Sequence, residues 1–316
     1  MSSVKALFQG LGRVLASPAL VLFLWLVSLI VATPLAISMA ASIEESVGAS
    51  LVHQKLRDGF DMGWYGEFAA RAKGIEKTLS PSLVGAGAFF DNIEAWLNGR
   101  LFEMLPGLVA LGITYALLWA LLLGGIFHRY AEGTRGRFRL AELLSHGAEF
   151  FFRFVRLAVL SGFLYYLVYR FASWLFSWIE DRTRDVTLER AVLVQVILGS
   201  LLVALLLTLV NMAFDYAKIA AYKENRRSMV LAAIRGFRLV RGNLGRTTLL
   251  YYGLGALGLV LLGAYHSVAP GPGQASASSI AVAFLAGQAY LVARLVLRLT
   301  FYAGQMALYE SPKFKR

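Results

Sequence analysis

The chain has 316 residues, of which 58% are hydrophobic and 16% are charged, and its mean hydropathy is +0.62. Soluble domains average about 45–50% apolar and about 25% charged residues, so this composition excludes an ordinary water-soluble fold. Cysteine is absent, which excludes a disulfide framework, thiol catalysis and thiolate metal sites, and the net charge of +12 raises the question of an anionic partner.

Six apolar runs are each about 20 residues or longer, the length needed to span a bilayer core of ~30 Å. They comprise residues 18–41, 106–128, 157–179, 191–217, 247–268 and 279–303. The first run follows basic residues, as a secretory signal does, but it exceeds the apolar core of about 7–15 residues of a cleaved signal. We therefore predict an all-α membrane protein in which residues 1–316 form one integral domain with six transmembrane helices. The first helix is expected to be retained and to bend near Pro34.

The segment before the first crossing, residues 1–16, has an amphipathic pattern. One helical face carries Val4, Leu7, Phe8, Leu11 and Leu15, and the other carries Lys5, Gln9 and Arg13. This pattern predicts a helix that lies flat on a membrane surface.

Residues 43–105 are the one sizeable segment outside the six runs. They contain more acidic than basic residues and include aromatic residues such as Trp64, Phe68 and Trp96, which suit the headgroup layer of a membrane. We predict a helical cap outside the cytoplasm, and leave open whether it is a lid over a cavity or a docking surface for a partner.

The loops between the later crossings alternate in charge. Segments 129–156 and 218–246 are strongly basic, whereas 180–190 has more acids than bases and 267–278 has no charge. Short loops rich in lysine and arginine stay in the cytoplasm, so both basic segments, each with a surface helix, and both termini are predicted to be cytoplasmic.

Anionic headgroups attract each basic residue near the surface by about 1 kcal/mol, so the topology and contact with these headgroups explain the net charge. No nucleic-acid motif is present, and nucleic acid is not an expected partner. The residues expected to contact headgroups or a partner membrane protein are Arg226, Arg227, Arg235 and Arg238.

Short motifs recur at the cytoplasmic ends of the second, fourth and sixth crossings. Tyr-Ala occurs at residues 130–131, 216–217 and 302–303, at intervals of 86 residues, and the later two segments also share an alanine and a glutamate. An arginine with two apolar residues precedes each odd-numbered crossing, at Arg13, Arg153 and Arg238. A fixed period suggests internal repetition. We predict three repeats, each with a surface helix, an outward crossing, an outer loop and an inward crossing.

Polar and charged residues within the crossings are the first candidates for function, because charges are costly in lipid and usually face a partner or a cavity. The candidates are Asp215, Arg294, Arg298, Asn211 and Arg170. Arg294 and Arg298 share one face of the sixth crossing, and we expect an ion pair between them and Asp215, with Asn211 as a hydrogen-bonding neighbour. Such a pair fits helix packing, snorkelling of the arginines to headgroups or handling of a substrate or ion. Arg170 is expected to lie near Gln195 or the outer loop.

Several motifs carry no function. GLGALG at residues 253–258 matches a dinucleotide fingerprint, but it lies inside an apolar crossing with no strand before it. His146 and Glu149 are two possible ligands on one helix face, which is too few for a metal site. No nucleophile elbow or phosphate loop is present. We expect no catalytic residue, no cofactor and no metal.

The surface helix followed by paired crossings, together with DYAKIAAYKENRR at residues 215–227, resembles a broad group of bacterial inner-membrane proteins of unknown function. It also distantly resembles the membrane domain found beside some glycerophosphodiester phosphodiesterases. The resemblance implies a multi-pass protein of the bacterial cytoplasmic membrane. Because the chain contains no phosphodiesterase domain, no catalytic residue carries over.

Two classes of function follow from these patterns. In the first, the helices enclose a path for a lipid-like or small amphipathic substrate, lined by Asp215, Arg294 and Arg298. In the second, the protein is a non-catalytic subunit or assembly factor of a membrane complex, whose cap and basic loops contact partners. An intramembrane enzyme is the third possibility, disfavoured because no nucleophile, metal cluster or carboxylate pair is present.

Overall fold

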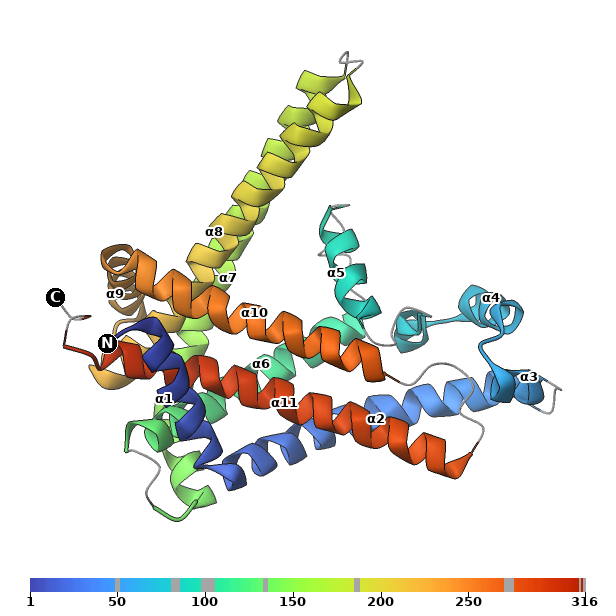
Figure 1. The fold of residues 1–316 in the computed structure, drawn as a ribbon, viewed down its shortest axis with the longest axis horizontal. Coiled ribbons are helices and arrows are strands. Elements are labelled where there is room, and N and C mark those ends of the chain that lie inside the picture. Colours follow the sequence, from blue (N-terminus) through green and yellow to red (C-terminus); the bar gives the residue numbers. More distant parts are fainter. Residues whose placement is uncertain are drawn as a thin grey trace. The chain divides into compact units, whose positions relative to one another are not determined.

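The computed structural model describes residues 1–48, 52–80, 86–97, 106–132, 136–184, 188–269, 276–312 and 314. Every regular element in this part of the chain is a helix (Figure 1). Parts of the predicted cap, of the uncharged loop 267–278 and of the C-terminal tail lie outside the described residues.

Six helices are long and apolar enough to cross a membrane. They are α2 (Pro18–Val47), α6 (Pro106–Ala131), α7 (Leu140–Thr183), α8 (Glu189–Lys223), α10 (Leu244–Val268) and α11 (Ala277–Tyr309). Each contains one of the six apolar runs, so the prediction of an all-α, multi-pass membrane protein is confirmed. Helix α2 continues through Pro34.

Two of the three predicted surface segments form short helices of their own before a crossing helix. The third does not form a separate helix. Helix α1 (Ser3–Leu15) ends before α2, and α9 (Met229–Gly242) ends before α10. Residues 140–156, by contrast, are the first part of the continuous helix α7. The sequence explains this difference. Ser17-Pro18 separates α1 from α2 and Gly242-Asn243 separates α9 from α10, whereas no helix-ending residue lies between Arg153 and Leu157.

The chain forms two compact units. The first contains Met1–Arg13, Leu117–Gly253 and Thr300–Arg316, and the second contains Val14–Ala116 and Leu254–Leu299. Helices α1, α6, α10 and α11 each contribute residues to both units. Both chain termini belong to the first unit.

Three close approaches between backbones hold the first unit together. A Cβ atom placed on Gly147 of α7 would lie 2.2 Å from the carbonyl oxygen of Leu121 in α6. A Cβ on Gly236 of α9 would lie 2.1 Å from the carbonyl oxygen of Ala213 in α8. A Cβ on Gly10 of α1 would lie 2.6 Å from the amide nitrogen of Gly304 in α11. Small residues allow helices to pack this closely, so only glycine fits at these points of α1, α7 and α9.

Aromatic rings fill the space beside these contacts. The ring of Phe127 in α6 lies with its centroid 6.0 Å from Phe154 in α7, 5.8 Å from Tyr222 in α8 and 5.9 Å from Tyr302 in α11. Offset and edge-to-face arrangements at this separation are favourable. Helices α6, α7, α8 and α11 therefore share one buried aromatic cluster. The polar side chains of α8 and α11 described in the next subsection lie beside this cluster.

The second unit contains the segment that was predicted to form a helical cap. Its elements are α3 (Val52–Asp58), α4 (Met62–Arg71), a 3₁₀ helix η1 (Gly74–Thr78) and α5 (Gly87–Leu97). Trp64 and Phe68 are buried with Ala72 against the end of α2, and the Trp64 indole donates to the Ser46 hydroxyl at 3.1 Å. Within the same unit, the Trp25 indole of α2 donates to the side-chain oxygen of Gln288 in α11 at 2.9 Å.

Replacing Gly10 with alanine is expected to destabilise the protein by about 1–3 kcal/mol, because the added methyl group overpacks the contact with Gly304. Gly12 lies on the same helix with no atom within 4 Å of a Cβ at its position, so Gly12→Ala is the matched control and is expected to leave stability unchanged or slightly raised. Thermal unfolding of both variants in detergent measures the difference. Equal stabilities would contradict the close packing of α1 on α11.

Candidate functional site

A buried charged pair lies on α8 within the first unit. Asp215 is 9% exposed, and its Oδ1 accepts a hydrogen bond from Lys218 Nζ at 2.9 Å. Its Oδ2 accepts a hydrogen bond from Gln305 Nε2 of α11 at 3.0 Å. The pair forms because residues three apart on a helix lie on the same face, and Gln305 connects it to a second helix.

The cluster has hydrogen-bonding capacity that the described residues do not use. Gln305 is 2% exposed, and its Oε1 atom has no hydrogen-bond partner in the described part of the chain. Lys218 carries three N–H donors, one of which is directed to Asp215, and 28% of its side chain is exposed. The site therefore offers an unused acceptor beside the ammonium group of a partly exposed side chain.

A second layer of polar groups lies next to this cluster. Asn211, one turn before Asp215, accepts a hydrogen bond from the Tyr165 hydroxyl of α7 at 3.3 Å. Its Nδ2 donates to the hydroxyl of Tyr251 in α10 at 2.6 Å. The Asn211 amide thus joins three crossings, and the Tyr251 hydroxyl keeps its own hydrogen available to donate.

Asp215 has partners other than the arginines that the sequence suggested. Both of its carboxylate oxygens are engaged, by Lys218 and Gln305. Arg294 and Arg298 belong to the second unit, where Arg294 is exposed and Arg298 is half-buried. The expected bond from Asn211 to the Asp215 region is replaced by its contacts with Tyr165 and Tyr251. A role for Arg294 and Arg298 stays a prediction.

Arg170 does not lie beside Gln195. Helices α7 and α8 run antiparallel, with Tyr165 against Asn211 and Ile179 against the position of Gly199. In this register Gln195 is level with a residue beyond Ile179, about 20 Å from Arg170 along the helix axis at ~1.5 Å per residue. Arg170 is exposed, and no hydrogen bond or ion pair links it to the residues that the structure describes.

A network of ion pairs and a hydrogen bond connects the ends of three helices, α1, α8 and α11. Glu310, directly after α11, contacts Arg13 of α1 at 2.8 Å and Lys223 of α8 at 2.5 Å. Glu224, directly after α8, accepts a hydrogen bond from the Tyr309 hydroxyl at 2.6 Å. We call Glu224 and Glu310 with these partners the terminal network.

The terminal network separates the four arginines expected to contact headgroups into two kinds. Arg226 and Arg235 both face the Glu224 carboxylate, Arg235 through its Nε at 3.5 Å. Arg227 and Arg238 are exposed. The latter two therefore keep their full charge for an external anion.

Both carboxyl groups of the terminal network have lowered pKa values. Burial acts to raise the pKa of Glu224, but the hydrogen bonds from Tyr309 and Arg226 outweigh it. Burial likewise acts to raise the pKa of Glu310, but the hydrogen bonds from Lys223 and Arg13 outweigh it. Both groups are therefore ionised at neutral pH, where they stabilise the fold.

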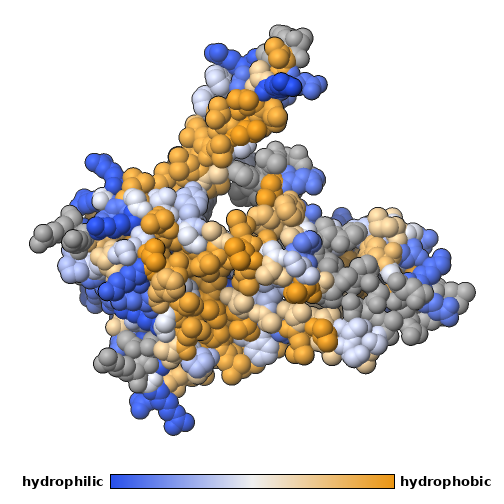
Figure 2. All heavy atoms as spheres, in the orientation of Figure 1, coloured by the Kyte–Doolittle hydropathy of each residue, from blue (hydrophilic) through white to orange (hydrophobic). Residues whose placement is uncertain are grey.

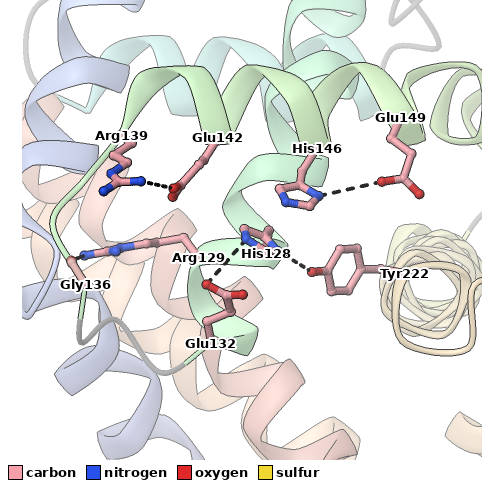
Figure 3. A network of polar contacts seen from close by, with 9 residues as sticks. All are labelled: His128, Arg129, Glu132, Gly136, Arg139, Glu142, His146, Glu149 and Tyr222. Atoms are coloured by element: carbon pink, nitrogen blue, oxygen red, sulfur yellow. Dashed lines mark hydrogen bonds and ion pairs between the residues drawn. The ribbon is translucent and has the colours of Figure 1, made fainter.

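Two histidine rings stack where α6 meets the first part of α7 (Figure 3). The centroids of His128 and His146 are 3.5 Å apart, with an angle of 22° between the rings. His128 Nδ1 lies 3.3 Å from the Tyr222 hydroxyl and its Nε2 lies 3.4 Å from the Glu132 carboxylate. His146 Nδ1 faces Glu149 at 3.6 Å. The ring nitrogens point to separate partners, and among the described residues no three histidine, aspartate or glutamate side chains are placed to hold a metal ion.

The sequence analysis missed Lys218 and Gln305. Lys218 follows Asp215 by three residues, a spacing that places both side chains on one face of a helix, so the sequence alone could have predicted this pair. Gln305 is a single amide in the apolar segment that ends α11, and nothing in the sequence indicates which helix it faces. The stacking of His128 on His146 likewise depends on the glycine contact between α6 and α7.

No protein-family model, curated protein or solved structure matches this chain.

Replacing Asp215 with asparagine is expected to destabilise the protein by about 1–3 kcal/mol, because the Lys218 charge is left without its partner. Loss of one member of a fully buried pair costs about 3–5 kcal/mol, and the partial exposure of Lys218 reduces this. Adding Lys218→Met to Asp215→Asn is expected to restore part of the loss. Thermal unfolding of the two single variants and the double variant measures the coupling, and additive losses would show that the two groups do not interact.

Acid is expected to destabilise the protein through the terminal network. Because the pKa values of Glu224 and Glu310 are lower in the folded protein than in the unfolded chain, their stabilisation is complete above the unfolded value of about 4.3 and is lost as the pH falls through the folded values. Unfolding measured from pH 7 to pH 3 is expected to show a shallower acid limb in Glu310→Gln than in the unaltered protein.

The control for this measurement is Glu180→Gln, at an exposed position near the far end of α7. It is expected to leave the acid limb unchanged. An acid limb that is identical in all three proteins would exclude Glu310 from the pH dependence.

Proposed function

We propose that this protein binds an amphipathic, lipid-like molecule with an anionic head group and moves it within the bacterial cytoplasmic membrane. The observation that carries the proposal is the unused bonding capacity at Lys218 and Gln305. Two N–H groups of Lys218 are available to an anion, and the Gln305 Oε1 atom is available to a hydroxyl or other donor of the same molecule. The Tyr251 hydroxyl, joined to the cluster through Asn211, supplies a further donor.

The charges of the crossings support an anionic ligand. In the six apolar runs of the sequence, Asp215 is the one acidic residue, whereas Arg170, Arg294 and Arg298 are basic. The Asp215 carboxylate is already engaged by Lys218 and Gln305. The six runs thus hold more basic than acidic residues, and a ligand that carries negative charge would balance this excess.

The orientation that we propose places both termini and both basic segments in the cytoplasm. The terminal network supports it, since it joins α1 near the N-terminus to α11 near the C-terminus and to the end of α8. The Ser3 hydroxyl also donates to the carbonyl oxygen of Arg246 at 2.9 Å, and the Asn243 side chain donates to the carbonyl oxygen of Phe314 at 3.3 Å. In this orientation Arg227 and Arg238 face anionic headgroups of the inner leaflet.

The glycine contacts support three repeats, in a register that differs from the Tyr-Ala motif. In α6, α8 and α11 the glycine of the neighbouring helix approaches the carbonyl oxygens of Leu121, Ala213 and Thr300. A tyrosine follows each of these residues by nine positions, and these are Tyr130, Tyr222 and Tyr309. Each tyrosine lies at or next to the last residue of its helix. This register pairs α7 with α6, α9 with α8, and α1 with α11.

Binding of three amphiphiles with the same alkyl chain tests the proposal. A long-chain alkyl phosphate is expected to bind the purified full-length protein at least about tenfold more tightly than the corresponding alcohol or amine, since one charge-assisted hydrogen bond contributes about 1.5–3 kcal/mol. Native mass spectrometry or a fluorescent phosphate ester measures the affinities.

Two variants assign the preference to the site. Lys218→Gln is expected to remove the preference for the phosphate, and Lys218→Arg to keep most of it. Lys5→Gln, at an exposed position of α1, is the matched control and is expected to bind as the unaltered protein does. Equal binding of the three amphiphiles, or a preference that persists in Lys218→Gln, would contradict the proposal.

A further inference from the structure

We propose that one face of α7 is a docking surface for the transmembrane helix of a partner protein that carries an aspartate or glutamate near the centre of the bilayer. The surface, here called the Arg170 face, consists of Phe163, Tyr166, Leu167, Arg170 and Trp174. This inference goes beyond the proposed function, because it concerns a different surface and a protein partner.

The Arg170 face is a continuous stripe on one helix. Phe163, Leu167, Arg170 and Trp174 follow one another at spacings of four, three and four residues, and Tyr166 lies four residues before Arg170, so the five residues lie on one side of α7. The four apolar and aromatic members are between 47% exposed, for Leu167, and 61% exposed, for Trp174. Figure 2 shows the apolar surface that runs along the α7–α8 hairpin below its polar tip. Aromatic residues and arginine are the residue types that carry most binding energy at protein interfaces.

Arg170 lies inside the apolar run 157–179. Along the helix axis it is about 20 Å from Leu157 and about 14 Å from Ile179, the ends of that run, at ~1.5 Å per residue. Both distances are greater than the length of an arginine side chain, so the guanidinium group does not reach either end of the run. An arginine at this depth is unfavourable by about 2.5–3.5 kcal/mol on insertion scales unless it is paired.

Among the residues that the structure describes, no carboxylate forms an ion pair with Arg170. Asp215 is the one acidic residue in the six apolar runs, and it is held by Lys218 and Gln305. A second copy of this chain would bring the same set of residues and hence no further acid. A lipid headgroup does not reside at the bilayer centre. The remaining source of a complementary charge is a carboxylate on a transmembrane segment of a different protein.

The absence of native cysteine makes the test direct. The full-length variant Ser2→Cys carries one fluorescent label, and the protein is reconstituted in phosphatidylcholine vesicles. The probe is a synthetic helix of about 23 leucine and alanine residues with one central glutamate and an acceptor dye. The comparison peptide has leucine in place of the glutamate. Energy transfer reports binding of each peptide.

We expect the glutamate peptide to bind about five- to tenfold more tightly than the leucine peptide, the range measured for polar contacts between membrane helices. Arg170→Leu is expected to make the two affinities equal, and Arg170→Lys to keep a preference for the glutamate peptide. Arg182→Gln is the matched control, because Arg182 lies on the same helix at its polar end, over the Trp178 ring, and it is expected to behave as the unaltered protein.

Equal binding of the two peptides to the unaltered protein would overturn the proposal, and this comparison needs no variant to fold. A preference that persists in Arg170→Leu would overturn it as well. Energy transfer between two labelled copies without peptide, abolished in Arg170→Leu, would assign the face to self-association instead. The preference for the alkyl phosphate at Lys218 is measured in a separate experiment. Failure of the Arg170 proposal therefore does not decide the Lys218 proposal, and failure of the Lys218 proposal does not decide the Arg170 proposal.

Discussion

The hydrocarbon core of a membrane cannot hydrate a charge, and this constraint governs how the first unit is organised. The six apolar runs contain three arginines and one aspartate. Asp215 is satisfied from two directions, by Lys218 on its own helix and by Gln305 on α11. The six runs therefore hold more basic than acidic residues. We propose that Lys218 binds an anionic head group and that Arg170 binds a carboxylate of a partner helix.

Glycine contacts determine where these charges can lie. Because Gly10, Gly147 and Gly236 allow backbones to touch, α1, α7 and α9 each pack directly on the end of a crossing helix. The same contacts bring Arg13 to Glu310 and His146 to His128. The polar side chains of the first unit thus meet because small residues, often overlooked in a sequence, set the distance between helices.

The sequence predicted the fold class and the six crossings because a long apolar run has one stable form in lipid, a helix that satisfies its own backbone. It located Asp215 and Asn211 as polar candidates for the same reason. It did not predict their partners, since the pairing of Asp215 with Gln305 depends on the rotation of α8 against α11. The Tyr-Ala motif recurs at an exact interval, yet the tyrosines that lie nine residues after the three glycine contacts are Tyr130, Tyr222 and Tyr309.

The central claim is that the Asp215 cluster holds a place for an anionic head group. Electron cryomicroscopy of the full-length protein in nanodiscs of phosphatidylglycerol tests it directly. The account predicts non-protein density in contact with both Lys218 Nζ and Gln305 Oε1. A map in which both atoms contact only side chains of this protein, with no further density next to them, would contradict it.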